Sequence, residues 1–324
     1  MMKYLVLVSR LLVGGLLILT GLIKANDVVG FAYRIDDCLS ASGLEFLRST
    51  SSLQAGMICF LELIVGAMLL VGRKVKLVTA LVVLTFLLHL IFGMISTKET
   101  VANEFRYVSS SVSISKDFIL LLLGLFLYLK SKQIKPWLSD KVTKVVLTTF
   151  VLFSAAIPIY SYNFLPIIDN GAYSVRTDLA LKNEQQFKAF EIFDMQGGIV
   201  TAEVFKNKEH QLFMVIEDIA TCNFKSLIKC NELAAQAEKS GIPFYGLASN
   251  EASMIEDFRH EVQAAYPFLK ADQQVLRSMI RSNPGLILLK GSTIEAKWHY
   301  NSIPNFVELN AAFKLKSGGQ FLIQ

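Results

Sequence analysis

Long apolar stretches in the first half of the chain constrain its fold more than any other feature. Five of them cover residues 4–23, 53–71, 75–95, 114–129 and 142–160. Each approaches the length of about 20 apolar residues that a bilayer-spanning helix needs. The fourth is the shortest, and Lys116 and Asp117 lie near one end of it, where snorkelling can bring both charges to the interface. The whole chain is 53% apolar, above the roughly 45–50% of soluble domains. We therefore predict an all-α transmembrane bundle of about five helices over residues 1–160.

The first apolar stretch also has features of a signal peptide. Lys3 precedes an apolar core, but the residues that follow, TGLIKAND (20–27), contain no small-x-small cleavage site. Because further apolar stretches follow, we interpret residues 4–23 as an uncleaved first helix.

The short loops between these stretches predict their orientation. Residues 72–76 hold Arg73, Lys74 and Lys76, and residues 130–144 hold five lysines and one acid. The loops at 24–52 and 96–116 are longer and roughly balanced in sign. Short basic loops stay in the cytoplasm, so the N-terminus is predicted inside and the chain after the fifth crossing outside. This predicts a multi-pass protein of the bacterial inner membrane with a periplasmic C-terminal domain.

Residues 161–184 form a predicted linker, in which Pro166 and the Asn170-Gly171 pair break regular structure. From 185 to 324 the pattern alternates between strands and helices. The predicted strands are a hairpin at 187–195 and 199–205, then 211–217, 242–249, 266–271 and a second hairpin at 284–292 and 293–300. The predicted helices are 223–241, 251–265, 272–282 and 303–314. This order predicts a soluble α/β domain whose sheet is mixed, because a closing hairpin and helix follow the alternating units.

Four cysteines are too few for a disulfide scaffold. Cys59 lies inside the second apolar stretch and is expected to pack there. Cys222 begins a predicted helix, where the helix dipole favours a reactive thiolate, although a buried structural cysteine is the alternative. Cys230 shares a helix face with apolar residues, so we expect it in the core. Cys38 lies in the first outer loop.

The soluble domain resembles the thioredoxin-like superfamily of the TlpA and peroxiredoxin kind. The resemblance is carried by FMVIEDIATC (213–222), IPFYGLAS (242–249) and SNPGLILLKGSTIEAKW (282–298). It implies that Cys222 is the catalytic position and that Pro284 is a cis-proline in a binding loop that faces it. The usual CxxC is missing, because Lys225 stands where the second cysteine would be.

The membrane half resembles DoxX proteins and the MauE branch involved in methylamine utilisation. The matching residues are Arg10 before LLVGG (11–15), GLIKANDVVGFAYRIDD (21–37) and ELIVGAMLLVGRKVK (62–76). The MauE branch commonly carries paired cysteines before its last core helix, whereas the corresponding residues 100–115 contain none. The whole chain thus resembles a bacterial family that joins a DoxX/MauE-like bundle to a periplasmic thioredoxin-like domain.

Three ionisable residues, Arg10, Glu62 and His89, lie inside the predicted membrane helices. Such residues are costly in lipid and face a partner or a cavity. They predict either a binding site for a proton, a quinone or a small molecule, or a structural Arg10–Glu62 pair with His89 bonded to a nearby carbonyl. A second group of charges follows the first helix and is expected to form a solvated cluster at the outer mouth of the bundle. Its members are Lys24, Asp27, Arg34, Asp36 and Asp37.

Two classes of function remain open from the sequence. One is an assembly or binding protein, anchored in the lipid bilayer, whose redox-degenerate thioredoxin-like domain holds a periplasmic protein. The other is a membrane thiol-redox protein in which Cys222 acts as a monothiol. No zinc spacing, phosphate loop or nucleic-acid motif is present, so we expect no metal, no cofactor and no nucleic acid. Whether the protein is an enzyme stays open.

Overall fold

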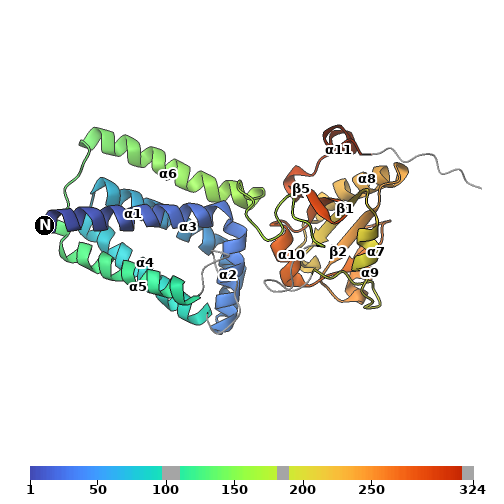
Figure 1. The fold of residues 1–324 in the computed structure, drawn as a ribbon, viewed down its shortest axis with the longest axis horizontal. Helices are drawn as coiled ribbons and strands as arrows, with labels where there is room; N and C mark the ends of the chain where they lie inside the picture. Colours follow the sequence, from blue (N-terminus) through green and yellow to red (C-terminus); the bar gives the residue numbers. More distant parts are fainter. Residues whose placement is uncertain (97–109, 181–189, 316–324) are drawn as a thin grey trace, which may run out of the picture. The chain divides into compact units, whose positions relative to one another are not determined.

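The computed structural model describes residues 1–96, 110–180 and 190–315 and divides into two compact units (Figure 1). The first unit is Met1–Tyr162, and the second is Asn163–Gln324. Most of the predicted outer loop at 96–116 and the first residues of the predicted hairpin at 187 fall outside the described residues.

The first unit is helical. Its helices are α1 (Met2–Asn26), α2 (Val28–Ala41), α3 (Ser51–Val71), α4 (Val75–Ser96), α5 (Ser110–Leu129) and α6 (Asp140–Asn163). Within the described residues, four segments are long and apolar enough to cross a membrane: Met2–Asn26, Glu45–Val71, Val75–Met94 and Asp140–Asn163. Helix α5 occupies the predicted fourth stretch but is not among these four, so a fifth crossing stays a prediction.

The predicted loop at 24–52 is wrong, because most of it is helical. Helix α1 continues to Asn26, α2 follows after the single residue Asp27, and α2 lies across one end of the unit (Figure 1). Apolar residues at helical spacing on α2, such as Val28, Ala32, Ile35 and Leu39, pack into the core with α3. The charges between these positions obscured that spacing in the sequence.

The second unit is built on one five-stranded sheet. Its strands are β1 (His210–Ile216), β2 (Phe244–Ala248), β3 (Phe268–Lys270), β4 (Gly285–Lys290) and β5 (Thr293–His299). Its helices are α7 (Thr201–Lys206), α8 (Phe224–Lys239), α9 (Ala252–Glu261), α10 (Gln273–Met279) and α11 (Phe306–Phe313). The strand order is β3-β2-β1-β4-β5. Strands β1, β2 and β3 run parallel, and β4 is antiparallel to both of its neighbours, so the prediction of a mixed sheet is confirmed.

The central strand β1 is buried on both faces. Leu212, Met214 and Ile216 face a core that α8, α9 and α11 complete. Phe213 and Val215 face a second core with α7 and α10. This two-sided burial explains why β1 is a continuous apolar run, which is the pattern of a strand covered on both faces.

The predicted strand at 199–205 is wrong. Phe193 and Ile199 form one antiparallel bridge, but Thr201–Lys206 is the short helix α7. The Thr201 hydroxyl accepts a hydrogen bond from the Ile192 backbone N–H at 2.8 Å. In a continued hairpin, a backbone carbonyl of the second strand would accept that hydrogen bond. Val204 and Phe205 are adjacent, and both are buried in the same core. In a strand, adjacent side chains point to opposite faces, so only one of the two could reach that core.

Several helix boundaries match the capping residues in the sequence. Asp272 accepts hydrogen bonds from the backbone of Gln274 and Val275 and begins α10, as predicted. Asn223 caps α8 through Ser226, and Asn305 and Glu308 form a capping box on α11. Gly241, with φ of 70°, follows the end of α8 in the left-handed conformation that glycine tolerates.

Candidate functional site

Three ionisable side chains from three helices meet inside the helical unit. Lys24 of α1 lies with Nζ 2.7 Å from Glu62 Oε1 of α3. His89 of α4 lies with Nε2 2.8 Å from the same oxygen and 3.0 Å from Lys24 Nζ. Glu62 and His89 were candidate residues from the sequence, and the structure brings them together through Lys24, which was expected in a solvated cluster at the outer mouth of the bundle.

Close packing of α1 against α3 positions this cluster. A side chain at Gly21 would meet Leu63 at 3.0 Å and Glu62 Cβ at 3.4 Å. At Gly66, an added Cβ would lie 2.9 Å from the Gly14 backbone oxygen. Small residues at these positions let the two backbones approach, as at other membrane helix interfaces. The side chains of Lys24 and Glu62 therefore lie next to each other on the closely packed pair α1 and α3.

The side chains of the cluster differ in exposure. Those of Glu62 and Lys24 are 2% and 4% exposed, and that of His89 is 21% exposed. The Phe31 ring lies 5.2 Å from Lys24 Nζ, in the range of a cation–π contact. Glu62 Oε2 is buried and has no hydrogen-bond partner among the described residues. The site thus combines an ion pair, an imidazole at its open edge and one carboxylate oxygen with spare acceptor capacity.

Arg10 is not part of this cluster, and the predicted Arg10–Glu62 pair is wrong. Its guanidinium donates to the backbone oxygens of Leu69 at 2.9 Å, Leu70 at 2.6 Å and Lys135 at 3.0 Å. The Trp137 ring covers the guanidinium at 4.2 Å from its centroid. Arg10 lies too far along α1 to reach Glu62, because α1 and α3 are antiparallel and Arg10 meets the C-terminal end of α3. It joins α1, α3 and the segment before α6.

A signal for Lys24 was present in the sequence. Gly14, Leu17, Gly21 and Lys24 follow one another at spacings of three and four residues and are all buried on one face of α1. Extending the first helix by one turn would have placed Lys24 on the face that packs against α3. Asp36 also differs from the predicted solvated cluster. It is buried and forms a bidentate ion pair with Arg48, with both hydrogen bonds at 2.8 Å.

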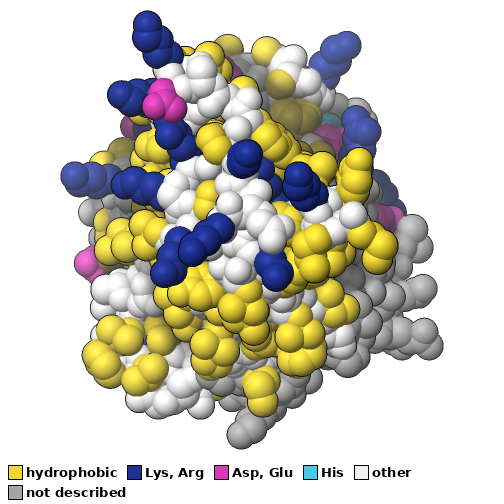
Figure 2. Space-filling model, turned by 90° about the vertical axis from the view of Figure 1, so that its left-hand side faces the viewer, with side chains coloured by type: hydrophobic (Ala, Val, Ile, Leu, Met, Phe, Trp, Pro, Cys, Tyr) yellow, Lys and Arg dark blue, Asp and Glu magenta, His cyan; other side chains and the backbone are white. Residues whose placement is uncertain are grey.

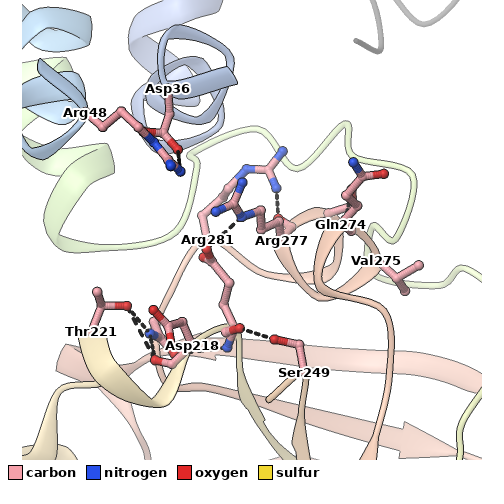
Figure 3. A network of polar contacts seen from close by, with 12 residues as sticks. Asp36, Arg48, Asp218, Thr221, Ser249, Gln274, Val275, Arg277 and Arg281 are labelled. Carbon is pink, nitrogen blue, oxygen red and sulfur yellow. Dashed lines mark hydrogen bonds and ion pairs between the residues drawn. The ribbon is translucent and has the colours of Figure 1, made fainter. Parts of the chain in front are cut away.

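In the sheet unit, the second candidate site is the loop between β1 and α8, shown in Figure 3 with Asp218, Thr221 and Ser249 labelled. Asn283 holds this loop from the segment before β4. Its Oδ1 accepts from the Glu217 N–H at 3.0 Å, and its Nδ2 donates to the Asp218 oxygen at 2.7 Å and to Thr221 Oγ1 at 3.0 Å. Asn250 accepts from the Ile219 N–H at 3.0 Å. The loop is therefore closed by side-chain amides.

Cys222 lies at the end of this loop and is only 7% exposed. It packs in the apolar core with Leu227 and Cys230. Burial, and secondarily the charge of Asp218, raises the pKa of the Cys222 thiol to about 12. Cys222 precedes the cap residue Asn223, and its surroundings favour the thiol over the thiolate, contrary to the expected effect of the helix terminus.

Cys230 is fully buried, as predicted, and burial raises its pKa to about 12 as well. Pro284 follows a cis Asn283–Pro284 bond. The Asn223 N–H donates to the Asn283 backbone oxygen at 3.0 Å, so the proline loop contacts the residue next to Cys222. Cys38 and Cys59 are both buried in the helical unit.

Basic side chains gather at the end of the helical unit where α1 begins (Figure 2). Those that are exposed or half-exposed there are Lys3, Arg73, Lys74, Lys76, Lys130, Lys132, Lys135, Lys141 and Lys144. Asp140 is paired with Arg73 at 2.6 Å, which leaves this end strongly positive.

The long apolar helices and the separate sheet unit define a multi-pass membrane protein with an attached α/β unit. Residues 2–103 of the 324 match the family model described as methylamine utilisation protein MauE. This part of the chain is thus similar to the MauE family, and Lys24, Glu62 and His89 all lie inside the matched range. Neither the curated proteins nor the solved structures gave a match.

Proposed function

We propose that the helical unit anchors a thioredoxin-like domain that binds or assembles a protein partner without exchanging disulfides. The strand order β3-β2-β1-β4-β5 and the contact between the proline loop and the β1–α8 loop support the thioredoxin-like interpretation. The DoxX resemblance stays a prediction. From the MauE family we carry over the membrane location and not the methylamine substrate, because the match covers residues 2–103 alone.

The observation that carries the proposal is the state of Cys222. A thiol exchanges disulfides as its thiolate, and a pKa of about 12 leaves a thiolate fraction at pH 8 that is roughly a thousandfold below that of an unperturbed thiol. Its burial also hinders the approach of a partner disulfide. A dithiol relay needs a second thiol at the motif position, which Lys225 occupies.

We also propose that the basic end of the helical unit lies in the cytoplasm and that the sheet unit lies in the periplasm of a bacterium. The nine cationic side chains at that end support this orientation through the preference of short basic loops for the cytoplasm. The partner is then a periplasmic protein.

Acid-trapping of intact cells, followed by alkylation mapping of Cys38, Cys222 and Cys230, tests the proposal. We expect Cys222 to be recovered as a free thiol with no mixed disulfide. In the purified protein, its alkylation rate should rise about tenfold per pH unit between pH 8 and pH 11, because the thiolate forms only as the pH approaches about 12. The alternative monothiol function requires a trapped adduct that Cys222→Ser abolishes, and finding one would reject the binding-only role.

A further inference from the structure

The Lys24–Glu62–His89 cluster cannot satisfy its three close contacts with one fixed arrangement of protons. All three heavy-atom pairs are within hydrogen-bonding distance, at 2.7, 2.8 and 3.0 Å. Two of the three contacts use the same imidazole atom, Nε2 of His89. That atom carries either a hydrogen or a lone pair, never both.

Each simple protonation state leaves one contact unfavourable. If the Lys24 ammonium donates to a lone pair on Nε2, that lone pair also faces Glu62 Oε1 at 2.8 Å. If Nε2 carries a hydrogen and donates to Oε1, the ammonium then meets an N–H group at 3.0 Å. A protonated imidazole beside a neutral Lys24 amine relieves the second conflict in part, because the amine nitrogen offers a lone pair to Nε2–H and still donates to Oε1. The single Nε2 hydrogen must then serve both Nζ and Oε1.

We propose that Lys24, Glu62 and His89 form a proton-transfer site in which one proton moves between Lys24 Nζ and His89 Nε2. In the forward step an N–H bond of the ammonium breaks, its electron pair stays on Nζ, and a new N–H bond forms at Nε2. Glu62 stays ionised and balances the single positive charge in both states. The imidazolium can then release its Nδ1 hydrogen to water, which completes a net transfer from Lys24. This site is independent of the function proposed for the sheet unit.

The exposure of the three residues gives the transfer a direction. His89 is the open member at 21%, whereas the Lys24 and Glu62 side chains are almost completely buried. Glu62 Oε2 is buried and without a hydrogen-bond partner among the described residues, so the carboxylate is closed to the surroundings. Proton exchange with the surroundings therefore occurs through His89 and not directly at Lys24.

Charged residues also lie on the helices that contact α4. Helix α5 packs against α4. A Cβ on Gly93 would meet Ile114, and a Cβ on Gly124 would meet Val82. This register places Lys116 and Asp117 of α5 at the level of His89. Asp117 is buried and lies 3.3 Å from Lys116. The charges nearest in sequence to Phe31 are Asp27, which precedes α2, and Arg34 on α2. The full-length chain must therefore be used in any test.

The decisive variant is Lys24→Arg. An arginine keeps the positive charge and the hydrogen bond to Glu62, but its guanidinium stays protonated in proteins. The probe is ¹⁵N NMR of histidine-labelled full-length protein in lipid nanodiscs, and His89→Asn identifies the His89 signals among the four histidines. We expect the His89 nitrogen shifts of the wild type to be averages of neutral and protonated imidazole, and Lys24→Arg to fix His89 in one neutral form.

Lys116→Arg is the matched control and should leave the wild-type spectrum unchanged. If the His89 signals of wild type and Lys24→Arg coincide across the pH range, the cluster is a structural ion pair and the proposal is wrong. If Lys24→Arg fails to fold, the double variant Lys24→Met/Glu62→Leu replaces it, because it removes the buried pair as a unit. The His89 nitrogen signals should then change, because no Lys24 proton remains to be shared, and a spectrum identical to that of the wild type would overturn the proposal.

Discussion

At the scale of single residues, the partners of a buried charge decide what it does. Arg10 and Lys24 are both buried cations on α1, yet Arg10 is bound by backbone oxygens and Lys24 by a carboxylate and an imidazole. The hydrogen bonds from the Arg10 guanidinium to backbone carbonyls connect α1 to α3 and to the segment before α6. An ammonium beside an imidazole has a proton to exchange, so the two cations have different roles.

The buried Lys24–Glu62 pair predicts a strong asymmetry between single and double substitutions. Glu62→Leu leaves the Lys24 charge buried without its carboxylate and should lower the free energy of unfolding by about 3–5 kcal/mol. Lys24→Met/Glu62→Leu should recover most of that loss, because no uncompensated charge remains. Detergent-induced unfolding of the purified protein measures both.

Asp140→Ala is the control for this comparison. Its carboxylate is 80% exposed and pairs with Arg73, so its loss should change the free energy of unfolding by less than about 1 kcal/mol. A double variant that is as unstable as Glu62→Leu would show that the cluster contributes packing and not charge compensation.

At the scale of elements, the β1–α8 loop is shaped by a residue from a distant segment. Asn283 supplies side-chain hydrogen bonds to Glu217, Asp218 and Thr221, and its backbone oxygen accepts from Asn223. Asn250, after β2, also accepts from the Ile219 N–H of this loop. The loop beside Cys222 is therefore held by residues from other segments.

Asn283→Ala should open this loop and expose Cys222. The lost side-chain hydrogen bonds contribute roughly 1–3 kcal/mol in total, which corresponds to about a 5- to 150-fold larger open population. The alkylation rate of Cys222 should rise by the same factor while the helix and strand content stays unchanged by circular dichroism.

Asn207→Ala is the matched control for the loop. Its side chain also closes a turn, by accepting from the Glu209 N–H at 3.0 Å, but that turn precedes β1. We expect it to leave the alkylation of Cys222 unchanged. An Asn283→Ala protein with wild-type alkylation would mean that core packing alone protects the thiol.

At the scale of the whole molecule, the two units differ in how much of them the sequence predicts. The strands and caps of the sheet unit follow from local patterns, such as the apolar run of β1 and the aspartate at position 272. Helix α7 could not be predicted, because Thr201 is recruited by the backbone of Ile192, nine residues earlier.

The helical unit shows the same limit more strongly. Hydropathy locates its long helices, since each must cover apolar length along its own segment. It does not reveal which ionisable residues meet. Lys24 and Glu62 are 38 residues apart, and only the packing of α1 on α3 brings them together. Glu62 and His89 were predictable as buried ionisable residues. The residue spacing on α1 also places Lys24 on a buried face, but it does not show that Lys24 meets Glu62 and His89.

The orientation proposed for the chain can be tested on intact cells with single cysteines. Lys132→Cys at the basic end should react with a membrane-impermeant maleimide only after the inner membrane is permeabilised. Glu238→Cys, exposed on α8, should react before that step. The four native cysteines are buried and give a low background. Labelling in the opposite order would reverse the proposed topology.

The pairing of α1 with α3 has a consequence for how the protein is made. When α1 leaves the ribosome, neither Glu62 nor the carbonyls of Leu69 and Leu70 have been synthesised, so the two buried cations of α1 lack these partners. An arginine at the centre of a lone membrane helix costs about 2.5–3.5 kcal/mol on insertion. Lys24, in the last turn of α1, costs less because its side chain can snorkel to the interface. We expect α1 to be retained at the insertion machinery until α3 emerges, and to enter the lipid together with it. The synthesis of α3, and not the sequence of α1 alone, then determines when the first helix inserts into the membrane.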